Sequence, residues 1–214
     1  MQSQGERPQI RRRGKEWRER LTALVLLVPA SPLLLLSAAA IKLESVLRPA
    51  ARGPIFFREA RVARGEVIGL LKFRTLSASA LADLGPGPTH IARYEKAGEI
   101  TIVGRFIRQW YLDELPQLLN IVRGDMLLIG TRPYPLELYE KELAQGITRK
   151  RDMPAGLIGP VQAHKGDERA SDGGVGLDAA YWEAFQKLSG WRLLLLDLKI
   201  VARSLKVQLQ HKGL

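Results

Sequence analysis

The sequence predicts a small mixed α/β domain carried on an N-terminal membrane helix. Residues 21–41 carry no charge and are rich in Leu, Val and Ala, a run long enough to cross the ~30 Å hydrocarbon layer as a helix. Short apolar segments at residues 54–57 and 67–73 are typical of strands. From Leu115 onward, apolar residues recur at i, i+3, i+4 and i+7 until Gly124, which predicts a helix with one buried face.

The membrane helix is predicted to be re-entrant, broken in its middle at Ser31 and Pro32. Pro29 and Pro32 interrupt the run, and a proline inside a helix removes a backbone hydrogen bond and clashes with the preceding turn. Basic residues flank the run on both sides: Arg11, Arg12, Arg13, Lys15, Arg18 and Arg20 before it, and Lys42, Arg48 and Arg52 after it. Because cationic flanks favour the cytoplasm, both ends are satisfied only if the segment does not cross.

Two other interpretations of this segment stay open. One is an ordinary kinked transmembrane helix. The other is a cleaved signal peptide, since basic residues precede the run and residues 37–40 resemble a cleavage site. The apolar run is longer than a usual signal core, and prolines interrupt it. The expected organisation is therefore a basic segment at residues 1–20, a re-entrant helix at residues 21–48 and a folded domain at residues 49–214.

Composition narrows the class of partner. The chain has 214 residues, a formal net charge of +11 and no cysteine. The charge favours a polyanionic partner, and the lack of cysteine excludes disulfides and thiolate metal sites and fits a cytosolic working face. Nucleic acid is not expected, because the positive charges are spread through segments that flank the membrane run, aromatic residues make up 7% and no recognition motif appears.

The rest of the domain is predicted to be mostly helical. A buried strand is expected at residues 126–129, a polar helix from about 136 to 145, a glycine-rich loop at 166–176 and helix from 177 to 209. Near the C-terminus, basic residues such as Lys199 oppose apolar ones such as Trp191. Such an amphipathic helix either lies at the membrane interface or packs on the core, and the sequence favours neither.

Two adjacent carboxylates, Asp113 and Glu114, lie where the best-predicted helix begins. One interpretation is that Asp113 is simply the N-cap. The other is a phosphate site, because Arg105 and Arg108 precede the pair, Arg132 follows it, and helix N-termini with arginines bind phosphate. Adjacent helical residues point about 100° apart, so the two carboxylates would divide the work. One would attack phosphorus while the other holds Mg²⁺.

Several motifs in order along the chain resemble the bacterial sugar transferases that initiate glycan assembly on polyprenyl phosphate. They are Gly53-Pro-Ile-Phe-Phe57, Lys72-Phe-Arg-Thr-Leu76, Ile100–Arg108, Leu112-Asp-Glu-Leu-Pro-Gln-Leu-Leu-Asn120, Arg123-Gly-Asp-Met126, Gly130-Thr-Arg-Pro133, and Pro154, Gly156-Leu157, Gly159 and Gln162. The match runs from the membrane helix to the C-terminus. The family's usual glutamine is Glu59 here, and its usual Gly-Pro-Arg-Pro is Gly130-Thr-Arg-Pro133.

The resemblance implies a compact phosphoglycosyl transferase on the cytoplasmic face of the inner membrane. Asp113 would be the nucleophile and Glu114 the Mg²⁺ partner. The enzyme would move a sugar 1-phosphate from a UDP-sugar to undecaprenyl phosphate through an aspartyl phospho-sugar, releasing UMP, as the first membrane step of glycan synthesis. Substrate-binding residues would be Lys72, Arg74, Arg105, Arg108, Arg132, Pro133 and Gln162. Few X-Pro bonds are cis, so a cis peptide at Pro133, in a tight turn that shapes the nucleotide site, stays an open alternative.

A competing hypothesis is a non-catalytic basic membrane adaptor that recruits anionic lipids or assembly partners through its terminal basic helices. This hypothesis leaves Asp113 and Glu114 unexplained. The identity of the sugar, the glycan pathway and the formation of a homodimer through the anchor stay open at this level.

Overall fold

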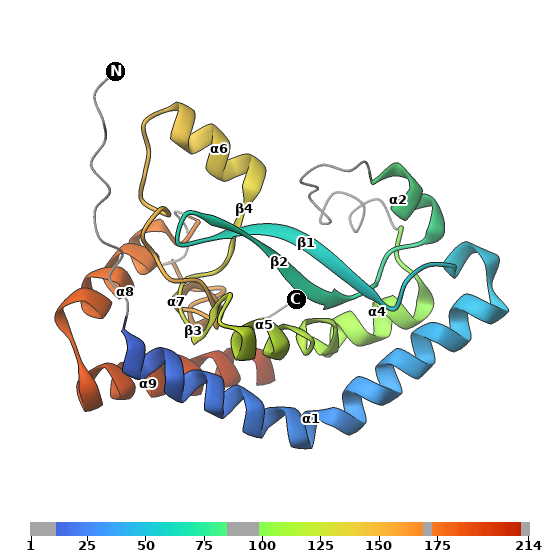
Figure 1. Cartoon of the computed structure of the whole chain (residues 1–214), viewed down its shortest axis with the longest axis horizontal. Coiled ribbons are helices and arrows are strands. Elements are labelled where there is room, and N and C mark those ends of the chain that lie inside the picture. Colours follow the sequence, from blue (N-terminus) through green and yellow to red (C-terminus); the bar gives the residue numbers. More distant parts are fainter. Residues whose placement is uncertain (1–11, 85–98, 169–172, 211–214) are drawn as a thin grey trace.

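A long bent helix, α1 (Arg13–Leu47), forms the base of the molecule in this computed structural model, which describes residues 12–84, 99–168 and 173–210 (Figure 1). The helix runs unbroken through Pro29 and Pro32, so the prediction of a broken helix is wrong. Pro32 cannot donate to the carbonyl four residues back, and the Ser31 hydroxyl donates to that carbonyl, of Val28, at 2.7 Å instead. The helix therefore bends, and both arms rise toward the domain.

Each arm of α1 carries a buried carboxylate that accepts hydrogen bonds from the domain above it. Glu19, on the first arm, accepts from the Leu128 amide at 2.9 Å. Glu44, on the second, accepts from the amides of Ile102 and Val103 at 2.9 and 3.1 Å. These two amides belong to the first turn of helix α4 (Ile102–Gln109), where a carboxylate also interacts favourably with the positive end of the helix dipole. Helix α1 is thus fastened to the domain on both sides of its bend.

An antiparallel hairpin lies above α1 and spans the domain. Strands β1 (Phe56–Ala63) and β2 (Glu66–Phe73) pair from Phe56↔Phe73 to Ala63↔Glu66. Arg64 and Gly65 between them have φ of 52° and 76°, as a two-residue hairpin turn with two left-handed positions requires. The first strand was expected only at residues 54–57 and in fact continues to this turn. Strand β4 (Tyr134–Pro135) adds to the outer edge of β1.

Helix α5 (Gln117–Arg123) closes the other edge of the hairpin and confirms the best-predicted element. Asn120, fully buried, accepts from the Leu71 amide at 2.9 Å and donates to the Gly69 carbonyl at 2.9 Å and to Asp125 at 2.8 Å. One side chain therefore satisfies backbone groups that an edge strand would leave unpaired. Gly124, with φ of 90°, ends the helix as predicted.

A two-stranded parallel sheet lies beside the hairpin. It consists of β3 (Leu127–Ile129), close to the predicted strand, and β5 (Gly156–Ile158). A Cβ on Gly156 would lie 2.1 Å from the Gly130 nitrogen, so only glycine allows the two segments to approach. Short helices α6 (Leu136–Ala144) and α7 (Pro160–Ala163) follow β4 and β5, and α2 (Ala78–Asp83) follows β2.

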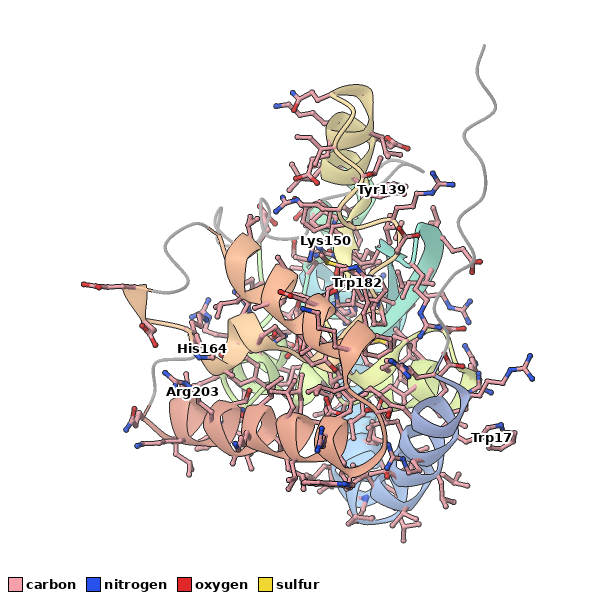
Figure 2. The ribbon with its side chains drawn as sticks, turned by 90° about the vertical axis from the view of Figure 1, so that its left-hand side faces the viewer. Trp17, Tyr139, Lys150, His164, Trp182 and Arg203 are labelled. Atoms are coloured by element: carbon pink, nitrogen blue, oxygen red, sulfur yellow. The ribbon has the colours of Figure 1, made fainter. Side chains whose placement is uncertain are left out.

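The C-terminal helical segment is two helices, α8 (Val175–Lys187) and α9 (Gly190–Leu209), rather than the continuous one that was predicted. In α9, Leu193 and Ile200 pack in the core, while Trp191 and Leu198 are 66% and 53% exposed. Buried Asp197 of α9 accepts from Tyr181 at 2.9 Å and pairs with Lys15 of α1. Figure 2 shows α9 and the first arm of α1 along one side of the molecule, with α6 at the opposite side.

Part of the predicted glycine-rich loop at residues 166–176 lies outside the described residues, as do residues 1–11 of the basic N-terminal segment.

Candidate active site

Asp113 and Glu114 lie on a single 3₁₀ turn, residues Leu112–Glu114, between α4 and α5. Tyr111 before the turn has φ of 56°, a left-handed conformation that non-glycine residues seldom adopt. Helix α5 begins only after Pro116 and has no side-chain cap, so the interpretation of Asp113 as its N-cap is wrong. Asp113 is 8% exposed. The fold therefore holds this carboxylate in a strained connection, where functional residues are often found.

The carboxylate of Glu114 lies between two cations that come from distant parts of the chain. Its Oε1 is 3.7 Å from Nζ of Lys72 on β2 and 3.7 Å from Nη2 of Arg132, in the turn between β3 and β4. Lys72 also lines a small pocket together with Asp113. The structure thus brings together four of the residues that the sequence nominated, two acidic and two basic.

Glu59 holds Lys72 in this position from the neighbouring strand. Its carboxylate is almost fully buried, with Oε2 3.3 Å from Lys72 Nζ and Oε1 2.5 Å from Arg61 Nη2. Burial by itself would raise the pKa of Glu59, but the charges of Lys72 and Arg61 outweigh it and lower the pKa below its ordinary value. Glu59 is therefore ionised, and Lys72 lies between two carboxylates, Glu59 and Glu114. Sequence reasoning noted Glu59 only as a departure from the family pattern.

Further cations gather around Glu114. Lys165 follows α7, and its pKa is lowered first by burial and then by the positive charges of Arg132 and Arg108, while Glu114 opposes the shift. The pKa of Tyr111 is raised by burial and by Glu114. Arg108, Arg132 and Lys165 are therefore close enough for their charges to influence one another. Sequence reasoning missed Lys165, although a basic residue three positions after Gln162 was a usable signal.

Arg74 and Arg105 are placed differently. The Arg74 side chain is 1% exposed and donates to the carbonyls of Pro54, Leu76 and Ala51 at 2.9, 2.7 and 2.8 Å. A fourth bond reaches the Ser45 hydroxyl at 2.9 Å. These bonds fasten the segment before β1 to α1, which is a structural role. Arg105 lies exposed on α4.

Pro133 and Gln162, two further predicted binding residues, lie near Arg132. Within the described chain no peptide bond is cis, which excludes the open alternative of a cis bond at Pro133. Gln162 donates to the Leu157 carbonyl at 3.3 Å. Its Oε1 is buried and has no hydrogen-bond partner among the described residues, which leaves an acceptor available to a ligand.

The acidic pair suits Mg²⁺ but is not a complete metal cage. No group of three or more His, Asp or Glu side chains capable of holding a metal occurs in the described part of the chain. Mg²⁺ in phosphate-transferring sites is commonly held by one or two carboxylates together with substrate phosphate oxygens. Asp113 and Glu114 supply that number of oxygen ligands, and the surrounding cations suit the phosphates.

Comparison with known proteins gives this site its context. The profile of the bacterial sugar transferase family matches residues 10–211. The chain is 36% identical over 190 residues to a UDP-glucose:undecaprenyl-phosphate glucose-1-phosphate transferase of Caulobacter vibrioides, covering 86% of this chain and 65% of that protein. It is 31% identical over 207 residues to the exopolysaccharide production protein ExoY of Sinorhizobium fredii, covering 90% of this chain and 84% of that protein.

A third relative is much longer. The galactosyl transferase CpsE of Streptococcus agalactiae is 33% identical over 159 residues, which cover 70% of this chain but 35% of that protein. The chain therefore spans 65% and 35% of the Caulobacter and Streptococcus relatives that it matches.

Proposed function

Because the chain belongs to the bacterial sugar transferase family, we propose that it transfers a sugar 1-phosphate from a UDP-sugar to undecaprenyl phosphate and releases UMP. The observation that carries the proposal is the placement of Glu114 at 3.7 Å from both Lys72 and Arg132, next to the buried carboxylate of Asp113. The name of the relative from Caulobacter vibrioides supports the same donor and acceptor chemistry.

In the proposed mechanism Asp113 is the nucleophile. An oxygen of its carboxylate forms a bond to the sugar-bearing phosphorus as the bond from that phosphorus to UMP breaks. An oxygen of undecaprenyl phosphate then attacks the same phosphorus, and the bond to Asp113 breaks, which regenerates the carboxylate. One phosphoanhydride is consumed and one is formed.

The cations around Glu114 would neutralise the diphosphate and the charge that develops during transfer. Lys72, held between Glu59 and Glu114, supplies a fixed point charge, and Arg132 supplies a fork of donors from the other side. When bound, Mg²⁺ would neutralise diphosphate oxygens as a Lewis acid, with Glu114 as its protein ligand. Gln162 would offer its free acceptor to the donor nucleotide.

We propose further that α1 enters and leaves the membrane on the cytoplasmic side. It is the one described helix long and apolar enough to span a membrane. Both of its arms rise toward the domain and both flanks are basic (Figure 1). Exposed apolar residues of α9, among them Trp191 and Leu198, would lie at the interface beside the first arm.

The function is tested by UMP release from a panel of UDP-sugars in detergent with undecaprenyl phosphate and Mg²⁺. We expect lipid-dependent release that chelation with EDTA abolishes, and loss of at least about a hundredfold in Asp113→Asn and Glu114→Gln, as for the removal of a group that acts in the transition state. Unchanged release in both variants would contradict the assignment. If no donor supports release while the protein still binds anionic vesicles, the adaptor hypothesis takes its place.

The topology has a separate test. The chain has no native cysteine, so a single cysteine can be placed at Arg18 or at Arg48, on either flank of the apolar run. In spheroplasts, an impermeant maleimide should leave both positions unlabelled until the membrane is opened. Labelling of one position alone in intact spheroplasts would show a spanning helix. In a Pro32→Leu background, which should straighten the helix, we expect that one-sided pattern.

A further inference from the structure

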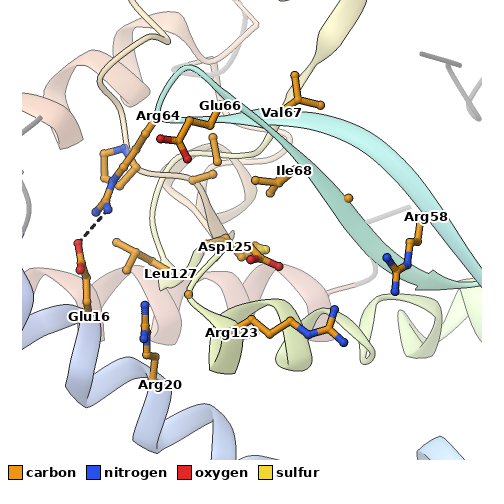
Figure 3. Close-up of a pocket in the computed structure, with 16 residues that line it drawn as sticks. Glu16, Arg20, Arg58, Arg64, Glu66, Val67, Ile68, Arg123, Asp125 and Leu127 are labelled. Atoms are coloured by element: carbon orange, nitrogen blue, oxygen red, sulfur yellow. Dashed lines mark ion pairs between the residues drawn. The ribbon is translucent and has the colours of Figure 1, made fainter. Parts of the chain in front are cut away.

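A second pocket, which we call the hairpin pocket, lies between the first arm of α1, the hairpin and the end of α5 (Figure 3). Its volume is about 370 Å³. Its lining includes Arg20 of α1, Arg58 of β1 and Arg123 of α5, with apolar Val67, Ile68 and Met126. Asp113, Glu114, Lys72 and Arg132 do not line it. The hairpin pocket is thus separate from the candidate active site.

Three arginines of this pocket lack an acidic partner. Within the described residues, no carboxylate lies within ion-pair distance of Arg20, Arg58 or Arg123, whereas Arg64 at the far end pairs with Glu16 at 2.8 Å. The Asp125 carboxylate, also in the lining, accepts from Asn120 at 2.8 Å. In Figure 3 Arg20 points into the pocket from α1, and Arg58 and Arg123 point toward one another at its other end. Two guanidinium groups from different elements, those of Arg58 and Arg123, thus come together at one end of the pocket without a carboxylate in ion-pair distance, which suits a phosphate, and Arg20 adds a positive charge at the other end.

The position of Arg20 is fixed by the end of α5. A Cβ on Gly124 would come 1.8 Å from Arg20 Nη2, so the guanidinium lies directly against this glycine. Gly124 has φ of 90°, which a side chain would seldom allow. The same residue that ends α5 therefore leaves room for the first arginine of the pocket.

The position of the pocket relative to the apolar run of α1 indicates a lipid headgroup as its ligand. On the membrane placement proposed above, the apolar run begins at Leu21, directly after Arg20, and Glu16 is the earliest pocket residue of α1. At 1.5 Å per residue both lie within about 8 Å of that run, which is about the thickness of the headgroup layer. Trp17 between them is 71% exposed and points outward (Figure 2), as tryptophans at the membrane interface do.

We propose that the hairpin pocket binds the phosphodiester headgroup of one anionic phospholipid, such as phosphatidylglycerol. The guanidinium groups of Arg58 and Arg123 would hold the phosphate, Arg20 would add positive charge at the other end of the pocket, and the apolar lining would cover the glycerol and the first acyl carbons. Such a lipid would orient the domain on the bilayer without taking part in the reaction. The inference rests on the proposed membrane placement and not on the transfer chemistry.

The test is native mass spectrometry of the full chain in detergent, where no membrane surface potential contributes. The double variant Arg58→Ala/Arg123→Ala removes two exposed residues, and Arg48→Ala/Arg52→Ala removes the same charge from the other flank of α1. We expect one phosphatidylglycerol per chain, retained in the control pair. Because loss of a hydrogen bond to a charged group weakens binding by at least about tenfold, the first pair should bind it at least about tenfold more weakly.

Further arms distinguish the source of the phosphate and separate the pocket from the active site. Phosphatidylcholine and the soluble headgroup glycerophosphoglycerol should bind at least about tenfold more weakly than phosphatidylglycerol. UMP release in lipid-free detergent, and its KM for undecaprenyl phosphate, should not change in Arg58→Ala/Arg123→Ala. Equal losses in the two variant pairs, equal binding of phosphatidylcholine or of the soluble headgroup, or a raised KM for the acceptor would each overturn the proposal.

Discussion

Replacing Asn120 by Ala should cost about 3 kcal/mol of stability, because this residue joins α5 to the edge of the hairpin. The side chain is fully buried and makes three hydrogen bonds, to the Leu71 amide, the Gly69 carbonyl and Asp125, at 2.8 to 2.9 Å. A buried hydrogen bond contributes about 1 kcal/mol net, and a donor left unpaired in the core costs about 1 to 3 kcal/mol. Three lost bonds therefore give about 3 kcal/mol, a large share of a typical folding free energy of roughly 5 to 15 kcal/mol.

The assay is thermal unfolding in detergent, followed by intrinsic fluorescence. For a domain of this size, 3 kcal/mol corresponds to a fall in Tm of roughly 6 to 12 °C. Gln117→Ala is the matched control, because Gln117 is also buried, lies one turn earlier on α5 and likewise loses an amide. A fall in Tm below about 3 °C for Asn120→Ala, or the same fall in both variants, would refute the reasoning.

Three more predictions follow from buried groups. The pKa of Glu59 is lowered in the folded state, so its contribution to folding stability is complete above the ordinary pKa of 4.5 and is lost as pH falls through the lowered value. Glu59→Gln should therefore flatten the decline of Tm between pH 5 and about 3. An unchanged slope would contradict this. Lys15→Met leaves buried Asp197 and Glu19 without their cation and should cost about 3 to 5 kcal/mol, measured by thermal unfolding beside the exposed-site control Arg18→Met. Gly156→Ala, whose Cβ would lie 2.1 Å from a backbone nitrogen, should prevent accumulation of folded protein, whereas Gly146→Ala, with nothing within 4 Å but a φ of 77°, should cost only about 1 kcal/mol.

The parts of the fold that local sequence determines were predictable. Apolar spacing from Leu115 and a glycine at 124 defined α5, because a helix needs one buried face and an end. The hairpin was only half recognised, since Arg64-Gly65 is not a standard turn dipeptide although both residues adopt positive φ. The split between α8 and α9 at Leu188–Ser189 was missed, because no proline marks it and a glycine follows it within the first turn of α9.

The candidate site was predictable in its acidic residues and less so in its basic ones. Asp113 and Glu114 are adjacent in sequence, so their proximity needed no fold. Arg74 could not be distinguished from Lys72 on sequence, because its structural role depends on the carbonyls of Ala51 and Pro54, which are distant along the chain. Likewise, the contact between Glu59 and Lys72 depends on the register of two strands, which a sequence pattern leaves undefined.

The two attachments of α1 to the domain have a consequence for the proposed membrane placement. Glu19 holds one arm to β3 and Glu44 holds the other to α4. The distance between these two attachment points in the domain therefore fixes how far apart the arms lie. The two prolines allow the helix to bend, and the distance between the attachment points sets the angle of the bend. On the proposed membrane placement, the folded domain then sets the depth to which the bend reaches, and with it the distance between the bilayer surface and Asp113. If the helix were exchanged for that of a relative without the amides of β3 and α4 that bind it, the new helix would keep its apolar character but would not adopt the same bend.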